Sequence, residues 1–395
     1  MNDIKHAACL AIDHASTELY DISQEIWKRP ETGSEEHNAH DVLTRFLESK
    51  GFNVERKFKL DTAFRAFLGS KENGPHIAVM CEYDALPVIG HACGHNLIAE
   101  SAIAAGLGVK AAFEKAGKPL GCITVLGTPS EETTGGKIDL INQGCFTDVD
   151  AAMMVHPAPG DSLNPQLLAC ASVIVKYSGK ASHAAAFPWE GVNALDAAVT
   201  CYQTISNLRQ QMKPTWRVHG VILNGGVKSN IIPEETELEY SIRTQNKTDL
   251  EILTKKCVDC FESAARATGC KVEIRFAGEP YLNVISNLPL LKAFESNCKI
   301  INAGDYSKTG SFLDSASTDM GNVSYVVPSI HPCFYIGSDA VNHTREFTVA
   351  SGDHKAQPYT IAQSKAMAMT AIDVFMNPGL LEEIKTKFKE DLFHN

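Results

Sequence analysis

The chain has 395 residues, a length that favours two domains. Hydrophobic residues make up 44% and charged residues 21%, a globular composition that excludes disordered, collagen-like and coiled-coil proteins. The net charge of −11 argues against a nucleic-acid partner. No apolar run approaches the roughly 18 residues of a membrane-spanning helix, so we expect no membrane partner either.

The cysteines indicate a reducing compartment. Twelve of them are spread over a long chain, which is too sparse for a disulfide scaffold, and the N-terminal residues do not form a secretory signal. We therefore expect reduced thiols and a cytoplasmic location. Cys257 and Cys260 form a CxxC pair, but the pair lies inside a helical pattern without a second ligand pair nearby, so we do not expect structural zinc there.

The first elements along the chain alternate between helix and strand. Residues 38–50 have apolar positions at helical spacing and stop at Gly51. Residues 76–80 and 122–127 are short apolar runs typical of buried strands, with an Ala-rich helix at 99–117 between them. Residues 149–157 predict another buried strand. This alternation indicates an α/β fold with a mostly parallel sheet flanked by helices on both faces.

The pattern changes near residue 170. A strand, a helix, two strands, a helix and a last strand follow one another over residues 170–286, the β-α-β-β-α-β order of a ferredoxin-like α+β domain. After residue 286 the chain returns to alternating helix and strand and ends in a long amphipathic helix. We therefore expect one domain from residues 1–169 and 287–395, with a second domain, residues 170–286, inserted into it.

Residues 91–95 (HACGH) concentrate soft metal ligands. His91, Cys93 and His95 occupy alternate positions in five residues, and two imidazoles with a thiol are the groups that zinc-like metals prefer. The alternative is a core turn with incidental histidines.

Several further candidate ligands follow predicted strands. Asp84, the adjacent pair Glu131 and Glu132, and His156 each stand after one of these strands. Taken alone, each is more typical of a solvated loop or a structural strand end. Open α/β sheets bring the carboxyl ends of their strands to one edge, so we expect these side chains near the HACGH turn. One open tetrahedral site cannot use so many ligands, which indicates a two-metal hydrolytic centre.

The motifs resemble a single family in order along essentially the whole chain. They are residues 81–100 (CEYDALPVIGHACGHNLIAE), 126–137 (LGTPSEETTGGK), 153–157 (MMVHP), 179–197 (GKASHAAAFPWEGVNALDA), 224–233 (NGGVKSNIIP) and 342–347 (NHTREF). The family contains the dinuclear-zinc aminoacylases, carboxypeptidase G and the hippurate and auxin-conjugate amidohydrolases, metallopeptidase family twenty. The resemblance implies a zinc-peptidase-like catalytic domain and an inserted dimerisation or lid domain.

The resemblance also implies a role for individual residues of the catalytic domain. Two divalent metal ions, zinc or else manganese or cobalt, are implied to bind Cys93, His95, Glu132, His156 and His343. Glu131 is implied to be the general base, and Asp84 to orient a ligand imidazole. Cys93 is expected to bridge the metals. Two positions depart from the family: Glu82 stands where many relatives have His, and Asn96 stands where many have Asp.

The inserted domain is implied to contribute to the reaction in a homodimer. His183 is implied to reach the other subunit's active site and polarise the scissile carbonyl, while Asn230 and Arg243 hold substrate oxygens. The sequence of residues 209–220 and 321–344 resembles one branch of the family, which implies dipeptides with a C-terminal lysine, ornithine or arginine, such as β-alanyl-lysine. Asp314 or Asp319 is a candidate to hold that basic side chain.

Three classes of function stay open at this point. The first is a metal-dependent dipeptidase, with an N-acyl-amino-acid amidohydrolase or a carnosinase-like dipeptidase as variants. The second is a Cys–His hydrolase with Cys93 as nucleophile, which leaves Glu132 and His156 without a role. The third is a binding protein that has kept the fold but not the activity.

Overall fold

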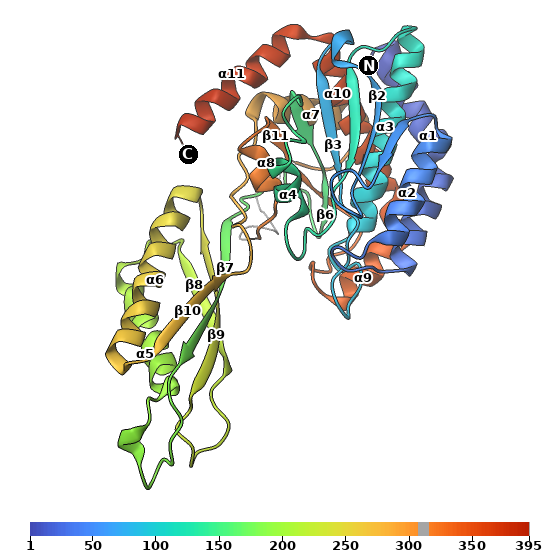
Figure 1. The fold of residues 1–395 in the computed structure, drawn as a ribbon. Helices are drawn as coiled ribbons and strands as arrows, with labels where there is room; N and C mark the ends of the chain where they lie inside the picture. The colour runs from blue at the N-terminus through green and yellow to red at the C-terminus, as the bar shows by residue number, and fades with distance from the viewer. Residues whose placement is uncertain (307–315, 395) are drawn as a thin grey trace. The chain divides into compact units, whose positions relative to one another are not determined.

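A computed structural model describes residues 1–306 and 316–394 and divides them into two compact units (Figure 1). The first unit comprises Met1–Gln166 and Val284–His394, and the second comprises Leu167–Asn283. The sequence predicts the same division at residues 170 and 286, a few residues further along the chain at each junction.

The first unit contains nine α-helices and eight strands among its described residues. The helices are α1 (Asp3–Lys28), α2 (His37–Ser49), α3 (His95–Ala116), α4 (Gly136–Asn142), α7 (Leu288–Ile301), α8 (Met320–Ser324), α9 (Arg345–Gly352), α10 (Gln357–Met376) and α11 (Pro378–His394). The strands are β1 (Asn53–Arg56), β2 (Phe64–Gly69), β3 (His76–Cys81), β4 (Cys122–Gly127), β5 (Ala151–Met153), β6 (His156–Ala158), β11 (Ser329–Ile330) and β12 (Cys333–Tyr335).

The main sheet of the first unit is mostly parallel, as predicted. Its strand order is β1-β2-β4-β3-β5-β11. Strands β4, β3, β5 and β11 pair in parallel, whereas β2 runs antiparallel to both β4 and β1. The short strands β6 and β12 form a separate parallel pair. The carboxyl ends of four parallel strands therefore meet at one edge of the main sheet.

The central strands are buried on both faces. In β3, Ile77 and Val79 join the apolar core formed with α1, α3 and α10, whereas Ala78 and Met80 join a second core with α4 and α8. Successive side chains of a strand point to opposite faces, so an unbroken apolar run fits a sheet that is covered twice. This double burial explains why the sequence shows short continuous apolar runs here.

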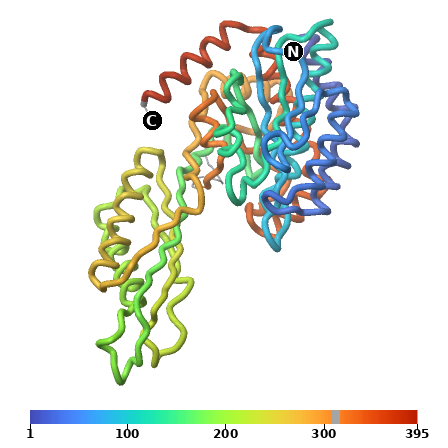
Figure 2. The backbone as a smooth tube through the Cα atoms, in the orientation of Figure 1, coloured from blue at the N-terminus to red at the C-terminus, as the bar shows by residue number. Residues whose placement is uncertain are grey.

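Helix α3 corrects one prediction from composition. By length and hydropathy it could cross a membrane, contrary to the expectation that no segment qualifies, but 89% of its apolar stretch is buried inside the protein. It packs against α1 and α10, so the C-terminal part of the chain returns to the N-terminal part (Figure 2). The predicted last helix corresponds to α10, which is buried on most of its surface, and a further helix, α11, follows it.

The second unit has the predicted ferredoxin-like architecture (Figure 1). Its elements are β7 (Ala169–Ser178), α5 (Ala194–Asn207), β8 (Arg217–Asn224), β9 (Glu235–Thr244), α6 (Lys247–Thr268) and β10 (Lys271–Phe276). The sheet order is β10-β7-β9-β8 and every pairing is antiparallel. Cys257 and Cys260 lie on α6 inside its apolar core, as small core residues.

Candidate metal centre

The predicted ligands gather at the carboxyl edge of the main sheet. Asp84 follows β3, as does Glu82, which is not among the predicted ligands; Glu131 and Glu132 follow β4, and His156 follows β5. Ligand sites of open α/β sheets lie at this edge because the connections that leave parallel strands open there. The sheet thus brings together residues that are up to 74 positions apart, as the pairing of β3 with β4 and β5 requires.

Three overlapping groups of ligand atoms could each hold a metal ion. One contains Cys93, His95 and His156, all buried, and within it the Cys93 Sγ and His156 Nε2 atoms are 3.5 Å apart. The second contains Cys93, Glu132 and His343, and the third His95, Glu131 and Glu132. Cys93, His95 and Glu132 each belong to two groups. The structure therefore brings all five predicted metal ligands together.

Gly94 makes the ligand-rich turn possible. It adopts a left-handed φ of 79° directly before α3, and a Cβ atom there would lie 2.6 Å from Cγ of Pro157. A glycine accepts this conformation and leaves room for the neighbouring chain. Cys93 and His95 can therefore approach His156 closely.

Asp84 contacts His95, the imidazole that the family resemblance implies it orients. Its Oδ1 atom lies 3.0 Å from Nδ1 of His95, and its Oδ2 accepts a hydrogen bond of 2.9 Å from the backbone N–H of Glu132. In His156 the Nδ1 atom lies 2.8 Å from the carbonyl oxygen of Pro157. These contacts engage Nδ1 of both rings, so Nε2 is the atom that each imidazole presents to a metal.

The environment shifts the pKa values of the two adjacent glutamates in opposite directions. Burial and the nearby charges of Glu82 and Glu132 raise the pKa of Glu131 well above its ordinary value. Burial also disfavours the charged form of Glu132, but a hydrogen bond with His343 and the charge of His95 lower its pKa. A pair of carboxyl groups with opposite pKa shifts is typical of one proton carrier beside one permanent anion.

Two residues of the centre sit in left-handed backbone. Ser130, before the glutamate pair, has φ 64°, and His343 has φ 66°. The Ser130 N–H donates to the buried carboxylate of Glu36 at 2.8 Å, and the His343 N–H donates to the Ala92 carbonyl at 2.8 Å. Non-glycine residues hold this conformation only where other contacts enforce it, as these hydrogen bonds do.

The remaining predicted residues lie in the second unit. His183 and Asn230 are exposed on adjacent loops, where the Ala184 N–H donates to the Asn230 carbonyl at 3.1 Å. Arg243 is half-buried near the far end of β9, eight positions beyond Glu235, the residue at which that strand begins. The structure therefore places Arg243 and the His183–Asn230 pair at opposite ends of one sheet.

Three candidate residues do not belong to the metal groups. His91 turns to α1, with Nε2 3.2 Å from the Ile26 carbonyl, so it is a core histidine. Asn96 donates to Ser23 and to the Ser351 carbonyl, away from His95. Asp319 is fully buried in an ion pair of 2.6 Å with Lys137, so the prediction that it holds a substrate side chain is wrong. Asp314 lies outside the described residues.

His331 is a residue of the centre that the sequence does not single out. It follows β11 at the same sheet edge, is 2% exposed, and stacks on His156 with ring centroids 5.4 Å apart. Burial lowers the pKa of both rings, to about 4 for His331 and about 3 for His156, so both are neutral near pH 7. β11 has only two residues, so the sequence before His331 contains no apolar run from which a strand could be predicted.

Buried polar atoms without a hydrogen-bond partner indicate, independently of any family resemblance, that the centre can hold metal ions. Buried polar atoms without a hydrogen-bond partner in the described part of the chain include Oε2 of Glu82 and Nε2 of His95. Each such atom costs about 1–3 kcal/mol unless something else satisfies it. Nε2 of His95 lies 3.5 Å from Oε2 of Glu82 and 3.9 Å from Oε1 of Glu132. A cation bound by His95 would satisfy its Nε2 atom.

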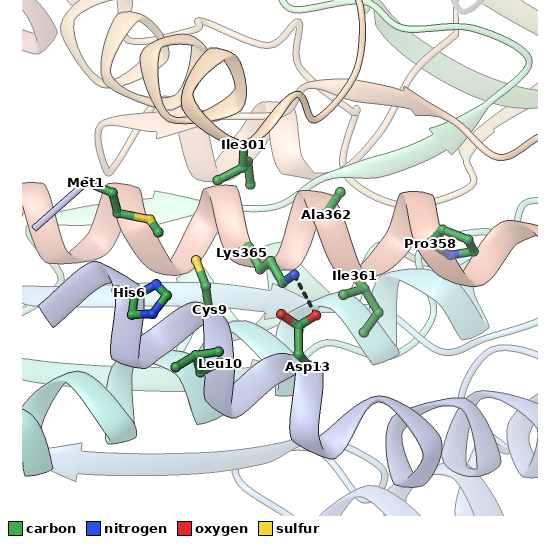
Figure 3. Close-up of a pocket in the computed structure, with 10 residues that line it drawn as sticks. All are labelled: Met1, His6, Cys9, Leu10, Asp13, Ile301, Pro358, Ile361, Ala362 and Lys365. Atoms are coloured by element: carbon green, nitrogen blue, oxygen red, sulfur yellow. Dashed lines mark ion pairs between the residues drawn. The ribbon is translucent and has the colours of Figure 1, made fainter. Parts of the chain in front are cut away.

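A separate surface hollow of about 420 Å³ lies between α1 and α10 (Figure 3). Its lining includes His6, Cys9 and the ion pair of 2.6 Å between Asp13 and Lys365. No predicted site residue lines it, so it is distinct from the metal centre.

Comparisons with known proteins agree with the fold. The peptidase dimerisation domain model matches residues 170–269. The Xaa-Arg dipeptidase of Mus musculus is 51% identical, over 98% of this chain and 92% of that protein, and the Homo sapiens one is 49% identical over the same shares. A Bacillus subtilis dinuclear metal binding peptidase from the M20 family superposes with a TM-score of 0.70 at 19% identity, covering 92% of this chain and 99% of that one.

The chain therefore belongs to the M20 family of metal-dependent hydrolases. Within that family, both relatives that share about half of its residues are named Xaa-Arg dipeptidases.

Proposed function

We propose that the protein hydrolyses the amide bond of dipeptides with a basic C-terminal residue, such as β-alanyl-lysine. The observation that carries this proposal is the convergence of five ligand residues beside Glu131, whose pKa shift is opposite to that of the ligand Glu132. The names of the two relatives at about half identity support the basic residue.

The protein side chains divide the work of this hydrolysis. Two divalent metal ions, zinc in our proposal, supply Lewis acidity and an acidified water when bound. Cys93, His95, Glu132, His156 and His343 hold them. Glu131 accepts a proton from the attacking water and delivers it to the leaving amine, a role that a raised pKa suits. Asp84 keeps His95 in the ligating tautomer.

The environment of Cys93 argues against a cysteine nucleophile. Burial and the charge of Glu132 raise the pKa of its thiol well above the ordinary value, whereas nucleophilic cysteines have lowered values. We expect complete loss of activity with a chelator and recovery on addition of zinc, cobalt or manganese. Activity that survives a chelator but not a thiol reagent would instead favour the Cys–His mechanism.

Substrate preference tests the proposal. We expect kcat/KM for β-Ala-Lys to exceed the values for β-Ala-His and for an N-acetyl amino acid, because a buried polar contact to the basic side chain can discriminate by orders of magnitude. A preference of about tenfold or more for the histidine or the acetylated substrate would assign a carnosinase-like or aminoacylase activity. No cleavage of any dipeptide by the metal-loaded protein would favour a binding function.

A homodimer through the second unit is part of the proposal. The matched dimerisation region includes the edge strand β8, on which Val221, Ile222 and Leu223 are 55%, 40% and 52% exposed. Consecutive exposed apolar residues on an edge strand favour pairing with another chain. All twelve cysteines are free thiols, which supports the proposed cytoplasmic location.

His183 is suited to polarise a carbonyl of the partner's substrate. Its Nδ1 accepts from the Ala185 and Ala186 backbone N–H groups at 3.3 and 3.2 Å, so in the neutral ring Nε2 carries the proton and can donate. Mixing inactive His183→Ala with inactive Glu131→Gln subunits should restore roughly a quarter of the activity, since half the dimers would be mixed and one of their two symmetric sites intact. No recovery after demonstrated subunit exchange would contradict action in trans.

A further inference from the structure

A second group of buried polar atoms involves α3 and belongs to none of the three metal-ligand groups. Glu100 is fully buried, and both of its carboxylate oxygens lack a hydrogen-bond partner in residues 1–306 and 316–394. The same holds for Oδ1 of Asn96, which is also fully buried, and for Oε1 of Gln357, which is 8% exposed. Native proteins satisfy most of their buried polar atoms, so these four oxygens require an explanation.

The residues that carry these oxygens are neighbours. Burial raises the pKa of Glu100, and the side chains of Gln357 and Ser23 lie close enough to offset part of that rise. Ser23, on α1, accepts a hydrogen bond of 3.0 Å from Nδ2 of Asn96. Asn96 and Glu100 are four positions apart on α3, a spacing that puts both side chains on one face of the helix. The carboxylate and the two amides therefore form one buried cluster between α1, α3 and the start of α10.

Hydrogen bonds of the two amides show which of their atoms are left over. Nδ2 of Asn96 donates to Ser23 and also to the Ser351 carbonyl at 2.9 Å. Nε2 of Gln357 donates to the Ser16 carbonyl at 3.0 Å. Turning either amide over would set its oxygen against a carbonyl oxygen, so the nitrogens stay where they are. Apart from the hydroxyl of Ser23, the groups that remain accept hydrogen bonds and cannot donate one.

A cluster of this composition suits a hard cation. Carboxylate and amide oxygens are the ligands that such ions take, whereas zinc-like metals prefer sulfur and imidazole. A proton on the carboxylate of Glu100 satisfies only one of the other acceptors, since one O–H makes one hydrogen bond. A cation is contacted by several oxygens at once, and it therefore satisfies the cluster better than a proton does.

The charge of the cluster selects a monovalent ion. Ser23, Asn96 and Gln357 are neutral, and no charged group is among the neighbours that shift the pKa of Glu100. One carboxylate compensates one positive charge. A divalent ion would keep an unmatched charge in the protein interior, which is costly.

We propose that Glu100, Asn96, Gln357 and Ser23 form a binding site for a monovalent alkali-metal ion, Na⁺ or K⁺, separate from the catalytic metal centre. The ion takes the place of the proton that Glu100 keeps when no metal ion is present. Asn96 directly follows the metal ligand His95 at the start of α3, so a bound ion braces the helix that carries this ligand against α1 and α10. The inference does not depend on the proposed hydrolysis.

Unfolding by urea at pH 9 tests the site in chelator-treated protein, without an activity assay. Burial raises the pKa of Glu100 to about 8, so at pH 9 a proton no longer competes strongly with the ion. Replacing choline chloride by NaCl or KCl at equal ionic strength should lower the unfolding constant of the wild type about tenfold or more, the effect of an ion at about ten times its Kd. The salt with the larger effect identifies the ion.

Three variants show where the ion binds. Glu100→Gln should abolish the difference between the salts, because the amide has no charge to compensate the ion. Gln357→Met, which removes one ligand oxygen and keeps the carboxylate, should reduce the difference. Glu114→Gln, on the same helix but with a side chain that is 64% exposed, should leave it unchanged. Equal unfolding of the wild type in all three salts, or an equal salt effect in wild type and Glu100→Gln, would overturn the inference.

Proton release is a second measurement, and it needs only folded protein. Adding the more effective salt to the wild type in weakly buffered solution at pH 7 should release close to one proton per chain, because the ion displaces the proton of Glu100. Tyr20 does not contribute, since burial and the charges of Asp353 and Glu100 raise its pKa above 10.0. Glu100→Gln should release no proton. The absence of release from the wild type, or equal release from both proteins, would contradict the proposed exchange.

Discussion

Replacing Glu131 by Gln should lower kcat by about 10²–10⁴-fold while leaving both metals bound, because general acid–base catalysis contributes that much and the amide cannot carry the proton. Glu131 is 7% exposed, and burial with its carboxylate neighbours raises its pKa. An isosteric amide also relieves that electrostatic conflict, so the variant should fold. The measurements are steady-state kinetics and metal content of the same sample.

Glu132→Gln is the matched control for this prediction. Glu132 contacts His343 at 3.3 Å and shares a ligand group with Cys93. Its amide variant should lose metal as well as activity. The opposite result, metal loss from Glu131→Gln and retention in Glu132→Gln, would exchange the two roles.

Stability should depend strongly on pH through Glu100. This residue on α3 is fully buried, and neither carboxylate oxygen has a hydrogen-bond partner in the part of the chain that the structure describes. Burial raises its pKa from 4.5 to about 8, and the nearby side chains of Gln357 and Ser23 offset only part of this effect. The folded protein therefore keeps a proton that the unfolded chain releases.

The sign of the effect follows from that difference. The contribution of Glu100 to stability is fully present below pH 4.5, falls as the pH rises, and is lost above pH 8. A shift of this size corresponds to about 5 kcal/mol in total. In Glu100→Gln this loss should vanish, so the variant should gain about 4 kcal/mol relative to wild type between pH 5 and pH 9.

Denaturant unfolding of the metal-free proteins across this pH range measures the difference. Glu114→Gln is the control, because Glu114 lies on the same helix with a side chain that is 64% exposed in an ion pair with Lys110. It should leave the pH dependence unchanged, since exposed ion pairs contribute little. An identical pH dependence in wild type and Glu100→Gln would show that the Glu100 carboxylate is hydrated.

The sequence predicts best those strands that are buried along their whole length. Strand β4 has the predicted bounds, 122–127, because every residue in it is buried and its ends are marked by glycine. Strands β1 and β2 are not predicted, since they lie at the side of the sheet, where β1 has no buried residue and β2 only two. Half-exposed strands carry a weaker hydrophobic signal than buried ones.

The residues of the site also differ in whether the sequence alone indicates them. Glu131, Glu132 and His156 could be found because each follows a recognisable strand. His343 could not, because it lies 187 positions beyond His156 in a loop, and only the family resemblance indicates it. Lys137 forms an ion pair with Glu82, and the carboxylate of Glu36 accepts a hydrogen bond from the Ser130 N–H. Sequence spacing carries no information about such contacts.

The return of α10 to pack against α1 and α3 sets an order for synthesis. All of the second unit, which ends at Asn283, leaves the ribosome before α10, which ends at Met376. At typical elongation rates this interval of 93 residues lasts roughly 5–20 s. The ferredoxin-like unit can fold during that time, while the apolar surfaces of α1 and α3 that α10 covers stay exposed. Chaperone binding to the nascent chain should therefore concentrate on these two N-terminal helices, and should end once residue 376 has emerged.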